Sequence, residues 1–210
     1  MGDTKKISLE VIKRLPRYYR YLGELGKSNI TRISSKELSE KMDVTASQIR
    51  QDLNCFGGFG QQGYGYNVES LYNSIGEILG LNHGHKTIIV GAGNLGKALA
   101  LYKSFEKRGF KLIGIFDNSK SKIGTFIGRH EVLDICTVEE FIKKNEPEIA
   151  VIAVPKEAVG EITALLSKCK IKGILNFSYT DISTLNGVEV ENVHISDSLM
   201  MLSYKIKDIE

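Results

Sequence analysis

Residues 87–100 have the sequence Thr-Ile-Ile-Val-Gly-Ala-Gly-Asn-Leu-Gly-Lys-Ala-Leu-Ala, and this stretch decides the fold of the second half of the chain. An apolar run leads into Gly91, Gly93 and Gly96, which have the spacing G-x-G-x-x-G. Between a strand and a helix, the first glycine permits a tight turn, the second lets the backbone approach a pyrophosphate, and the third lets the helix pack on the strand. The stretch therefore predicts a strand, a phosphate-binding turn and a helix.

The turn predicts a dinucleotide as ligand, and the residue at the end of the next strand supports that prediction. Asp117 closes a second apolar run and lies 21 residues after Gly96, near the spacing at which a carboxylate binds a ribose 2′-hydroxyl. The alternative is a glycine-rich turn that binds nothing. The turn residues expected to contact the dinucleotide are Gly91, Ala92, Gly93, Asn94, Leu95 and Gly96.

The rest of the second half alternates between apolar strands and amphipathic helices, which is typical of a parallel sheet with crossover helices. Strands are expected near 87–91, 111–117, 131–135, 149–154 and 173–177, and helices near 94–107, 137–144, 156–169 and 196–208. Ligands of such sheets lie at the carboxyl ends of the strands. Val154, Pro155, Asn176 and Phe177 stand at two of these ends. We expect them beside a nicotinamide ring, with a place in the core as the alternative for Phe177.

The composition is that of an ordinary globular protein. The chain has 210 residues, of which 42% are hydrophobic, and a net charge of +3 that by itself does not indicate a nucleic-acid partner. The distribution of charge along the chain is more informative, because residues 1–50 contain 11 Lys or Arg against 6 Asp or Glu. The three cysteines lie far apart in the sequence, which predicts no disulfide framework. The sequence has no apolar run long enough to cross a membrane, and its N-terminus is unlike a signal peptide. We therefore expect no membrane span and a cytoplasmic location.

The N-terminal segment begins with an amphipathic helix. An apolar stripe recurs every three or four residues, as expected for one buried helix face, and consists of Val11, Leu15, Tyr18, Leu22 and Leu25. Pro16 interrupts this stripe. It predicts a kink or a helix in two pieces, because proline removes a backbone donor and clashes with the preceding turn.

Two short helices across a tight turn follow, which is the helix-turn-helix pattern. The capping boxes Ser34-Ser-Lys-Glu37 and Thr45-Ala-Ser-Gln48 predict helices near 34–42 and 45–56. The buried face of the second helix is expected to contain Ala46, Ile49, Leu53 and Phe56. Its other face carries side chains of the types that contact base edges in DNA, namely Ser47, Gln48, Arg50, Gln51 and Asn54. The alternative is an ordinary helical hairpin with a polar face.

The next segment favours DNA binding. Residues 56–68 contain five glycines, and Phe59, Tyr64, Tyr66 and Val68 alternate with small or polar residues, which is typical of a β-hairpin. A hairpin directly after a recognition helix is a wing, and a flexible glycine linker is the alternative. The wing residues expected to contact DNA are Gln61, Gly63 and Tyr64, with Gln61 reaching a minor groove.

A linking helix near 69–81 and the polar segment 82–86 divide the chain. We expect a winged-helix domain at 1–81, a Rossmann-type domain at 82–195 and a C-terminal helix at 196–210 that packs on its own subunit or on a partner. His83 and His85 have no third ligand nearby, so no metal site is expected.

A dehydrogenase needs an acid or base beside its substrate. Beyond residue 86 the histidines are His130 and His194, and neither has a recognisable catalytic setting. A dinucleotide site without such partners favours a sensor over an enzyme. The competing interpretations are an NAD-dependent oxidoreductase with an accessory N-terminal domain, and a CoA- or nucleotide-binding module without redox sensing.

The chain resembles Rex, the bacterial family of redox-sensing repressors, over nearly its whole length. The resemblance is carried by Lys13-Arg-Leu-Pro-Arg-Tyr-Tyr-Arg-Tyr-Leu22, Gln48-Ile-Arg-Gln-Asp-Leu53, Gly63-Tyr-Gly-Tyr-Asn-Val68, Gly91-Ala-Gly-Asn-Leu-Gly96 and Gly173-Ile-Leu-Asn-Phe177. It implies a homodimer that exchanges its final helix between subunits. It also implies that the chain binds a near-palindromic operator and that NADH releases it, whereas NAD⁺ permits binding. We expect the operator to be AT-rich.

By position, the resemblance assigns DNA contacts to Ser47, Arg50, Gln51 and Gln61, and it brings Tyr102 near the nicotinamide. Two positions depart from the family pattern. Gln51 stands where many members have Lys or Arg, which bears on the choice of operator. His194 stands where others have an acid that contacts an arginine matching Arg20, and Asp197 is the nearby candidate to replace that acid.

Overall fold

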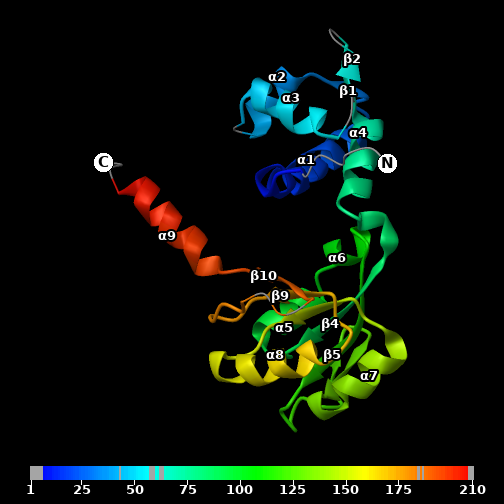
Figure 1. The fold of residues 1–210 in the computed structure, drawn as a ribbon, viewed down its shortest axis with the longest axis vertical. Coiled ribbons are helices and arrows are strands. Elements are labelled where there is room, and N and C mark those ends of the chain that lie inside the picture. Colours follow the sequence, from blue (N-terminus) through cyan, green and yellow to red (C-terminus); the bar gives the residue numbers. More distant parts are fainter. Residues whose placement is uncertain are drawn as a thin grey trace. The chain divides into compact units, whose positions relative to one another are not determined.

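The computed structural model describes residues 7–42, 44–56, 60–61, 64–183, 185 and 187–207 of the chain. The chain divides into two compact units, residues 1–82 and 83–210 (Figure 1). This boundary lies in the polar segment 82–86, one residue later than the division after residue 81 that the sequence predicts. The C-terminal helix, expected as a separate segment, belongs to the second unit.

The first unit is a winged helix. Its elements are α1 (Leu9–Lys27), β1 (Arg32–Ile33), α2 (Ser35–Met42), α3 (Ala46–Asn54), β2 (Gly60–Gln61), β3 (Gly65–Asn67) and α4 (Val68–Ile78). Strand β3 pairs antiparallel with β1 on one side and with β2 on the other. The succession of α2, α3 and the β2–β3 hairpin confirms the predicted helix-turn-helix and wing.

Helix α1 buries the predicted apolar stripe and also runs through Pro16 without interruption. The expectation of a helix in two pieces is therefore wrong. An interior proline costs a helix about 3 kcal/mol, whereas each fully buried apolar side chain contributes about 1.5–3 kcal/mol. Because buried side chains lie on both sides of Pro16, tertiary packing outweighs the local preference.

The two predicted capping boxes form to different extents. In the first, the Glu37 N–H donates to Ser34 Oγ (3.1 Å) and the Ser34 N–H donates to Glu37 Oε2 (2.7 Å). In the second, the Gln48 N–H donates to Thr45 Oγ1 (3.1 Å), but the Gln48 amide donates to Asp52 Oδ1 (2.8 Å) instead of returning to the cap. Helix α3 ends at Asn54, earlier than predicted, and Ala46 and Phe56 are half-buried.

The second unit is a Rossmann-type α/β domain. Its strands are β4 (His85–Val90), β5 (Phe110–Asp117), β6 (Phe126–Ile127), β7 (His130–Asp134), β8 (Ile149–Ile152), β9 (Gly173–Asn176) and β10 (Glu189–Asn192), in the order β10-β9-β8-β4-β5-β7-β6. Strand β6 pairs antiparallel with β7, and the other neighbours pair in parallel. The helices are α5 (Asn94–Ala100), α6 (Ser104–Lys107), α7 (Val138–Asn145), α8 (Val159–Ser167) and α9 (Ile195–Ile206), with 3₁₀ turns at Ile135–Thr137 and Lys156–Ala158. A further 3₁₀ turn, Leu81–His83, spans the boundary between the units.

Three features of this unit differ from the prediction. One is the two-residue strand β6, which the sequence does not predict. The helix expected at 94–107 breaks between α5 and α6, where the Tyr102 N–H bonds to Leu99 O (3.1 Å) and the Phe105 N–H bonds to Tyr102 O (3.0 Å) in three-residue turns. The sequence also does not predict β10. Its sequence, Glu-Val-Glu-Asn, contains one apolar residue and lacks the apolar run that marks the predicted strands, so pairing with β9 is what forms the strand.

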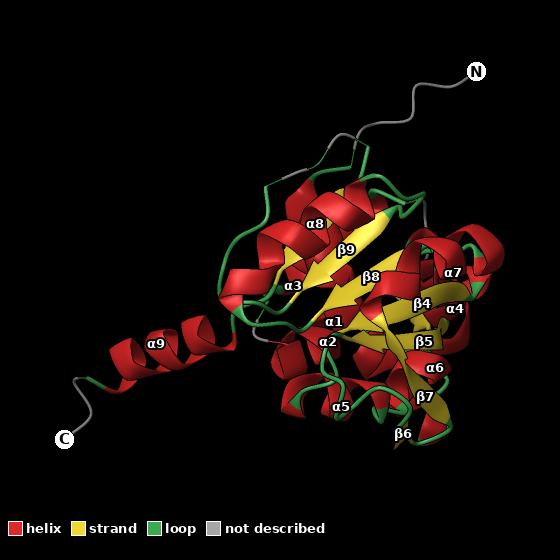
Figure 2. Cartoon of the chain, turned by 90° about the horizontal axis from the view of Figure 1, so that it is seen from below, coloured by secondary structure: helices red, strands yellow, loops and turns green. Residues whose placement is uncertain are grey.

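The two faces of the sheet are covered differently. Helices α7 and α8 cover one face (Figure 2), where Ile142 and Leu166 pack in one cluster with Ile88 and Phe116 of the strands. The opposite face carries a small cluster around Ile115. It also carries an apolar groove of about 390 Å³ whose lining includes Phe105, Phe110, Ile149, Val151 and Leu175.

Helix α9 presents an apolar surface. Seven large apolar side chains on it are each more than half exposed, namely Ile195, Leu199, Met200, Met201, Leu202, Tyr204 and Ile206. Extended exposed apolar surfaces in proteins usually mark interaction sites. In the part of the chain that the structure describes, no helix is both long enough and apolar enough to cross a bilayer.

Candidate dinucleotide cavity and nucleic-acid face

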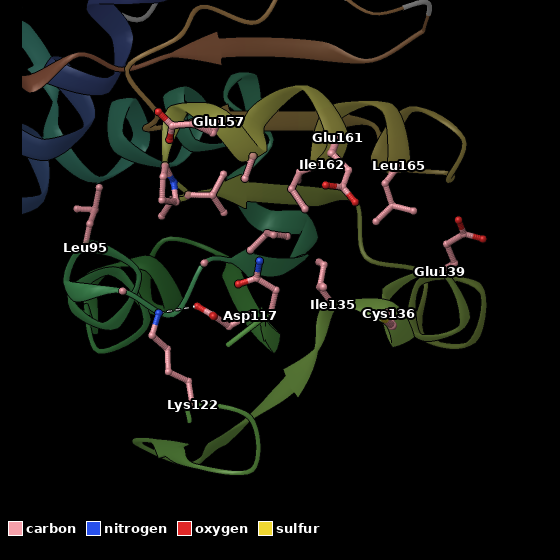
Figure 3. A pocket seen from close by; sticks show the side chains of 18 of the residues that line it. Leu95, Asp117, Lys122, Ile135, Cys136, Glu139, Glu157, Glu161, Ile162 and Leu165 are labelled. Carbon is pink, nitrogen blue, oxygen red and sulfur yellow. Dashed lines mark hydrogen bonds and ion pairs between the residues drawn. The ribbon is translucent and has the colours of Figure 1, made fainter. Parts of the chain in front are cut away.

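The second unit contains a cavity of about 960 Å³ at the carboxyl ends of β4, β5 and β8 (Figure 3). Cavities of roughly 300–1,000 Å³ are typical of small-molecule and cofactor sites. The predicted site residues that line it are Gly91, Gly93, Asn94, Leu95, Asp117, Val154 and Pro155. The structure thus gathers the glycine turn, the predicted ribose-binding carboxylate and the end of β8 around one space.

The glycine turn is built from backbone that approaches too closely for a side chain. Gly91 has φ of +106°, and a Cβ at this position would lie 2.3 Å from the carbonyl oxygen of Ala153. A Cβ on Gly96 would lie 1.8 Å from the carbonyl oxygen of Gly91. Gly93 differs, because nothing lies within 4 Å of an added Cβ. Two glycines therefore close the turn on itself, and the third faces open space.

Asp117 ends β5 and is only 7% exposed. Its Oδ2 accepts hydrogen bonds from the Ala92 N–H (2.7 Å) and Lys122 Nζ (3.0 Å), and its Oδ1 accepts one from the Ser119 N–H (2.8 Å). Burial opposes ionisation of Asp117, but the hydrogen bonds from Ser119, Ala92 and Lys122, together with the Lys122 charge, outweigh it and hold the pKa of this carboxyl below its ordinary value. The site therefore contains an ionised carboxylate, paired with Lys122, next to the glycine turn.

The far end of the cavity was not predicted. Its apolar lining includes Ile135 after β7 and Ile162 and Leu165 of α8, and Figure 3 shows Ile162 and Leu165 pointing from α8 into the space above Ile135. Carboxylates of Glu139 and Glu161 also line this end. The signal that could have found Ile135 is its place directly after a predicted strand, at the same edge of the sheet as Asp117.

Five predicted residues lie outside the cavity lining. Ala92 and Gly96 are buried in the turn itself, and Phe177 is half-buried after β9. Tyr102 is 51% exposed at the break between α5 and α6, with its ring edge-on to Phe105. The Asn176 side chain is fully buried, and its role in the structure is to hold the loop after β9.

The contacts of Asn176 account for that role. Its amide nitrogen donates to Thr180 O (2.8 Å) and Asn192 Oδ1 (2.8 Å). Its oxygen accepts from the Ser178 hydroxyl (2.6 Å) and N–H (3.0 Å). These polar atoms are directed at neighbouring protein groups, so the predicted cofactor contact of Asn176 has no support from the geometry.

The predicted DNA-contacting residues of α3 separate into two groups. Ser47, Arg50, Gln51 and Asn54 are exposed, whereas Gln48 is half-buried with its amide on Asp52. Arg50 is held across the helix-turn-helix, where its Nη1 donates to Ser35 Oγ (3.0 Å). The exposed group forms a polar face of the kind that contacts base edges.

The wing is described in part. Gly63 lies outside the described residues, and only the backbone of Gln61 is described, in β2. Tyr64 is exposed, and its carbonyl oxygen accepts a hydrogen bond from Arg32 Nη1 (3.1 Å). The sequence pattern does not identify Arg32 as a wing residue. Arg32 lies beside the wing only because β1 pairs with β3, where Arg32 is opposite Asn67.

The histidine segment at the domain boundary has a structural role. His85 belongs to β4, and its Nδ1 lies 2.9 Å from Glu148 Oε2. Over the described ranges, no group of three or more His, Cys, Asp or Glu side chains could hold a metal ion.

Both units match known protein families. Residues 6–54 match the family model described as "Putative DNA-binding protein N-terminus", and residues 82–180 match the model described as "CoA binding domain". A redox-sensing transcriptional repressor Rex from Thermoanaerobacter pseudethanolicus is 55% identical over 210 residues, which is 100% of this chain and 94% of that protein. Rex from Clostridioides difficile is 53% identical over 208 residues and 99% of both chains.

The chain belongs to the Rex family. Its relatives are redox-sensing transcriptional repressors, so this Rex-family chain is a regulator and not an enzyme. A crystal structure of the Rex-family repressor RSP with β-NAD⁺ and operator DNA is 55% identical, with a TM-score of 0.90 over 96% of this chain and 93% of that one. A structure of RSP with β-NADH is 51% identical, with a TM-score of 0.90 over 97% and 96%.

The crowded turn predicts the effect of adding one methyl group. Gly96→Ala is expected to weaken NADH binding at least about tenfold and to destabilise the second unit by about 1–3 kcal/mol, because the added carbon must displace backbone. NADH titration and thermal unfolding measure both effects. Gly160→Ala on α8 is the matched control, since nothing lies within 4 Å of its added Cβ; equal effects of the two changes would contradict this account.

Asp117 is expected to bind both redox forms alike. Asp117→Ala should weaken NADH and NAD⁺ together by about 1–3 kcal/mol, the usual effect of removing a hydrogen-bonding partner from a buried site. Calorimetry on both ligands measures this, with the exposed Glu131→Ala as control. A loss confined to one ligand would mean that Asp117 takes part in discrimination. Because its pKa is lowered in the folded chain, its contribution to stability is present at neutral pH and is lost as acid protonates it.

Proposed function

We propose that this chain represses transcription by binding operator DNA as a homodimer, and that NADH binding in the second unit releases the DNA. The observation that carries the proposal is the presence, in one Rex-family chain, of a dinucleotide cavity with a fixed carboxylate and a winged helix with an exposed polar recognition face. As a repressor that senses the dinucleotide pool, it would act in the cytoplasm.

The cavity supports one placement of the ligand. The pyrophosphate would lie over the open backbone at Gly93, and a ribose hydroxyl would donate to Asp117. The adenine would occupy the apolar end between Ile135 and Leu165, and the nicotinamide would lie toward Val154 and Pro155. Apart from the contacts to the nicotinamide ring, these contacts would be the same for NADH and NAD⁺.

Discrimination between the redox forms must therefore come from the nicotinamide end. The ring is planar and cationic in NAD⁺, and neutral and puckered in NADH. Tyr102 and Phe177 remain candidates for walls that respond to this difference, together with Pro155. A ligand shifts a conformational equilibrium only by its differential affinity for the two states, and near-complete release requires about 10⁴-fold discrimination.

A second copy of the chain suits the uncovered apolar surfaces of the second unit. Helix α9 exposes apolar side chains along its length, and the groove beside Phe110 and Val151 leaves part of the sheet uncovered. Exchange of α9 between two subunits would bury such surface in both. A two-fold dimer presents two recognition helices, so the operator should be near-palindromic, and we expect it to be AT-rich.

The direct test of the proposal is DNA binding by the full chain in the presence of NADH, NAD⁺ or neither. We expect binding to an AT-rich palindrome with NAD⁺ or without ligand, and release by NADH. Salt-independent or absent DNA binding, or hydride transfer to a small substrate, would instead support the oxidoreductase alternative. Neither His130 nor His194 lines the cavity, which argues against that alternative.

Arg50 is expected to contact a base. Arg50→Ala should weaken operator binding by about 1–3 kcal/mol if the guanidinium binds a guanine edge. The measurement is operator affinity by fluorescence anisotropy, with Lys144→Ala on α7 as an exposed cation in the other unit. Unchanged affinity would remove Arg50 from the base-contacting set.

The C-terminal helix is expected to hold the dimer together. Deleting residues 196–210, or replacing Leu202 by Asp, should convert dimers to monomers in analytical ultracentrifugation, because each removes apolar contact between subunits. An unchanged monomer–dimer equilibrium would contradict the exchange of α9.

A further inference from the structure

The recognition helix carries a carboxylate that does not face solvent. Asp52 is 0% exposed, although the nearby Gln51 and Asn54 of the same helix are open to solvent. Its Oδ2 accepts from Arg14 Nε (2.7 Å) and the Tyr18 hydroxyl (2.8 Å). Its Oδ1 accepts from Arg14 Nη2 (2.8 Å) and Gln48 Nε2 (2.8 Å).

Four hydrogen bonds, two to each oxygen, satisfy the Asp52 carboxylate. Arg14 binds it with two parallel N–H groups, the geometry in which arginine fixes orientation as well as distance. Burial opposes ionisation, but the hydrogen bonds from Arg14, Gln48 and Tyr18 and the charge of Arg14 outweigh it, so the pKa of Asp52 lies below its ordinary value. The cluster is therefore an ion pair with two further donors at neutral pH.

The donors come from two helices. Arg14 and Tyr18 lie one turn apart on α1, and Gln48 lies one turn before Asp52 on α3. The cluster thus fixes the rotation of α3 about its own axis relative to α1. It also holds the Gln48 amide at the side of α3 that faces α1, while Ser47, Gln51 and Asn54 stay exposed.

We propose that Asp52 is a positioning residue for operator recognition, which orients α3 on α1 and withdraws Gln48 from the bases. The inference rests on the proposed function, since it concerns how the operator is recognised. Base contacts require recognition side chains to be held within about 0.5 Å and 10–20° of the productive geometry. Phosphate contacts carry no direct sequence information and depend mainly on charge. Loss of the cluster should therefore reduce specificity more than non-specific affinity.

Two glutamines on α3 provide the sharpest test. Gln48 and Gln51 are the same residue type on one short helix, but Gln48 is bonded to Asp52 and Gln51 is exposed. Gln51→Ala should weaken operator binding at least about tenfold and relax the preference for one base pair, as expected for a residue that contacts a base. Gln48→Ala should leave the base preference at every operator position unchanged. A changed preference at one base pair in Gln48→Ala would overturn the inference.

Asp52→Asn tests the carboxylate itself. We expect the affinity for the operator to fall at least about tenfold, while the affinity for a scrambled duplex of equal length changes by less than about threefold. An equal loss on both duplexes would indicate general damage to the domain and would overturn a positioning role. NADH titration and the unfolding curve of the first unit accompany these measurements. If Asp52→Asn fails to fold, the comparison of Gln48→Ala with Gln51→Ala decides, because both leave the Arg14–Asp52 pair in place.

A double-mutant cycle separates positioning from simple loss of charge. In Arg14→Gln with Asp52→Asn, the loss of operator specificity should not exceed that of the more damaging single change, since both act through one contact. Additive losses would overturn the inference. The unsubstituted chain distinguishes failure of the proposed function from failure of the inference. If it shows no preference for operator over scrambled DNA, the proposed function fails, and the inference fails with it because no operator specificity exists for Asp52 to support.

Discussion

The second unit depends on the contact between the backbone of Gly91 and Gly96. An added Cβ on Gly96 would lie 1.8 Å from Gly91 O, so the turn closes only without side chains at these positions. Asp117 then fixes the turn from the neighbouring strand through the Ala92 N–H. The same carboxylate stands where a ribose is expected, so the residues that make the fold also make the ligand site. If the ligand is placed as proposed, the motif itself contacts NADH and NAD⁺ in the same way.

The first unit uses a different constraint. Its recognition helix is held by a buried ion pair between Asp52 and Arg14, and its wing by the pairing of β3 with β1 and β2. Both constraints hold α3 and β3 against the rest of the first unit. In the proposed dimer, a signal from the second unit would therefore move whole winged helices, which changes their spacing on a two-fold operator, and would leave α3 undeformed.

The sequence predicts what depends on local pattern. The glycine spacing, the position of Asp117 and the polar face of α3 all follow from residues within one strand–turn–helix unit or one helix. Gln48 shows the limit of such prediction. It is half-buried with its amide on Asp52, and Asp52 is in turn bonded to Arg14, which lies 38 residues away in the sequence. The continuous helix through Pro16 and the edge strand β10 likewise depend on packing and pairing that short-range pattern does not contain. The apolar end of the cavity, around Ile162 and Leu165, requires the three-dimensional placement of α8.

In the proposed function, one free energy couples the dinucleotide cavity to the DNA face. Such coupling is reciprocal, so a ligand that weakens operator binding must itself bind more weakly to the operator complex by the same factor. The most direct measurement is the NADH dissociation constant of the full chain with and without saturating operator duplex. We expect the operator to weaken NADH binding by the same factor by which NADH weakens operator binding. An NADH affinity unchanged by saturating operator would contradict it.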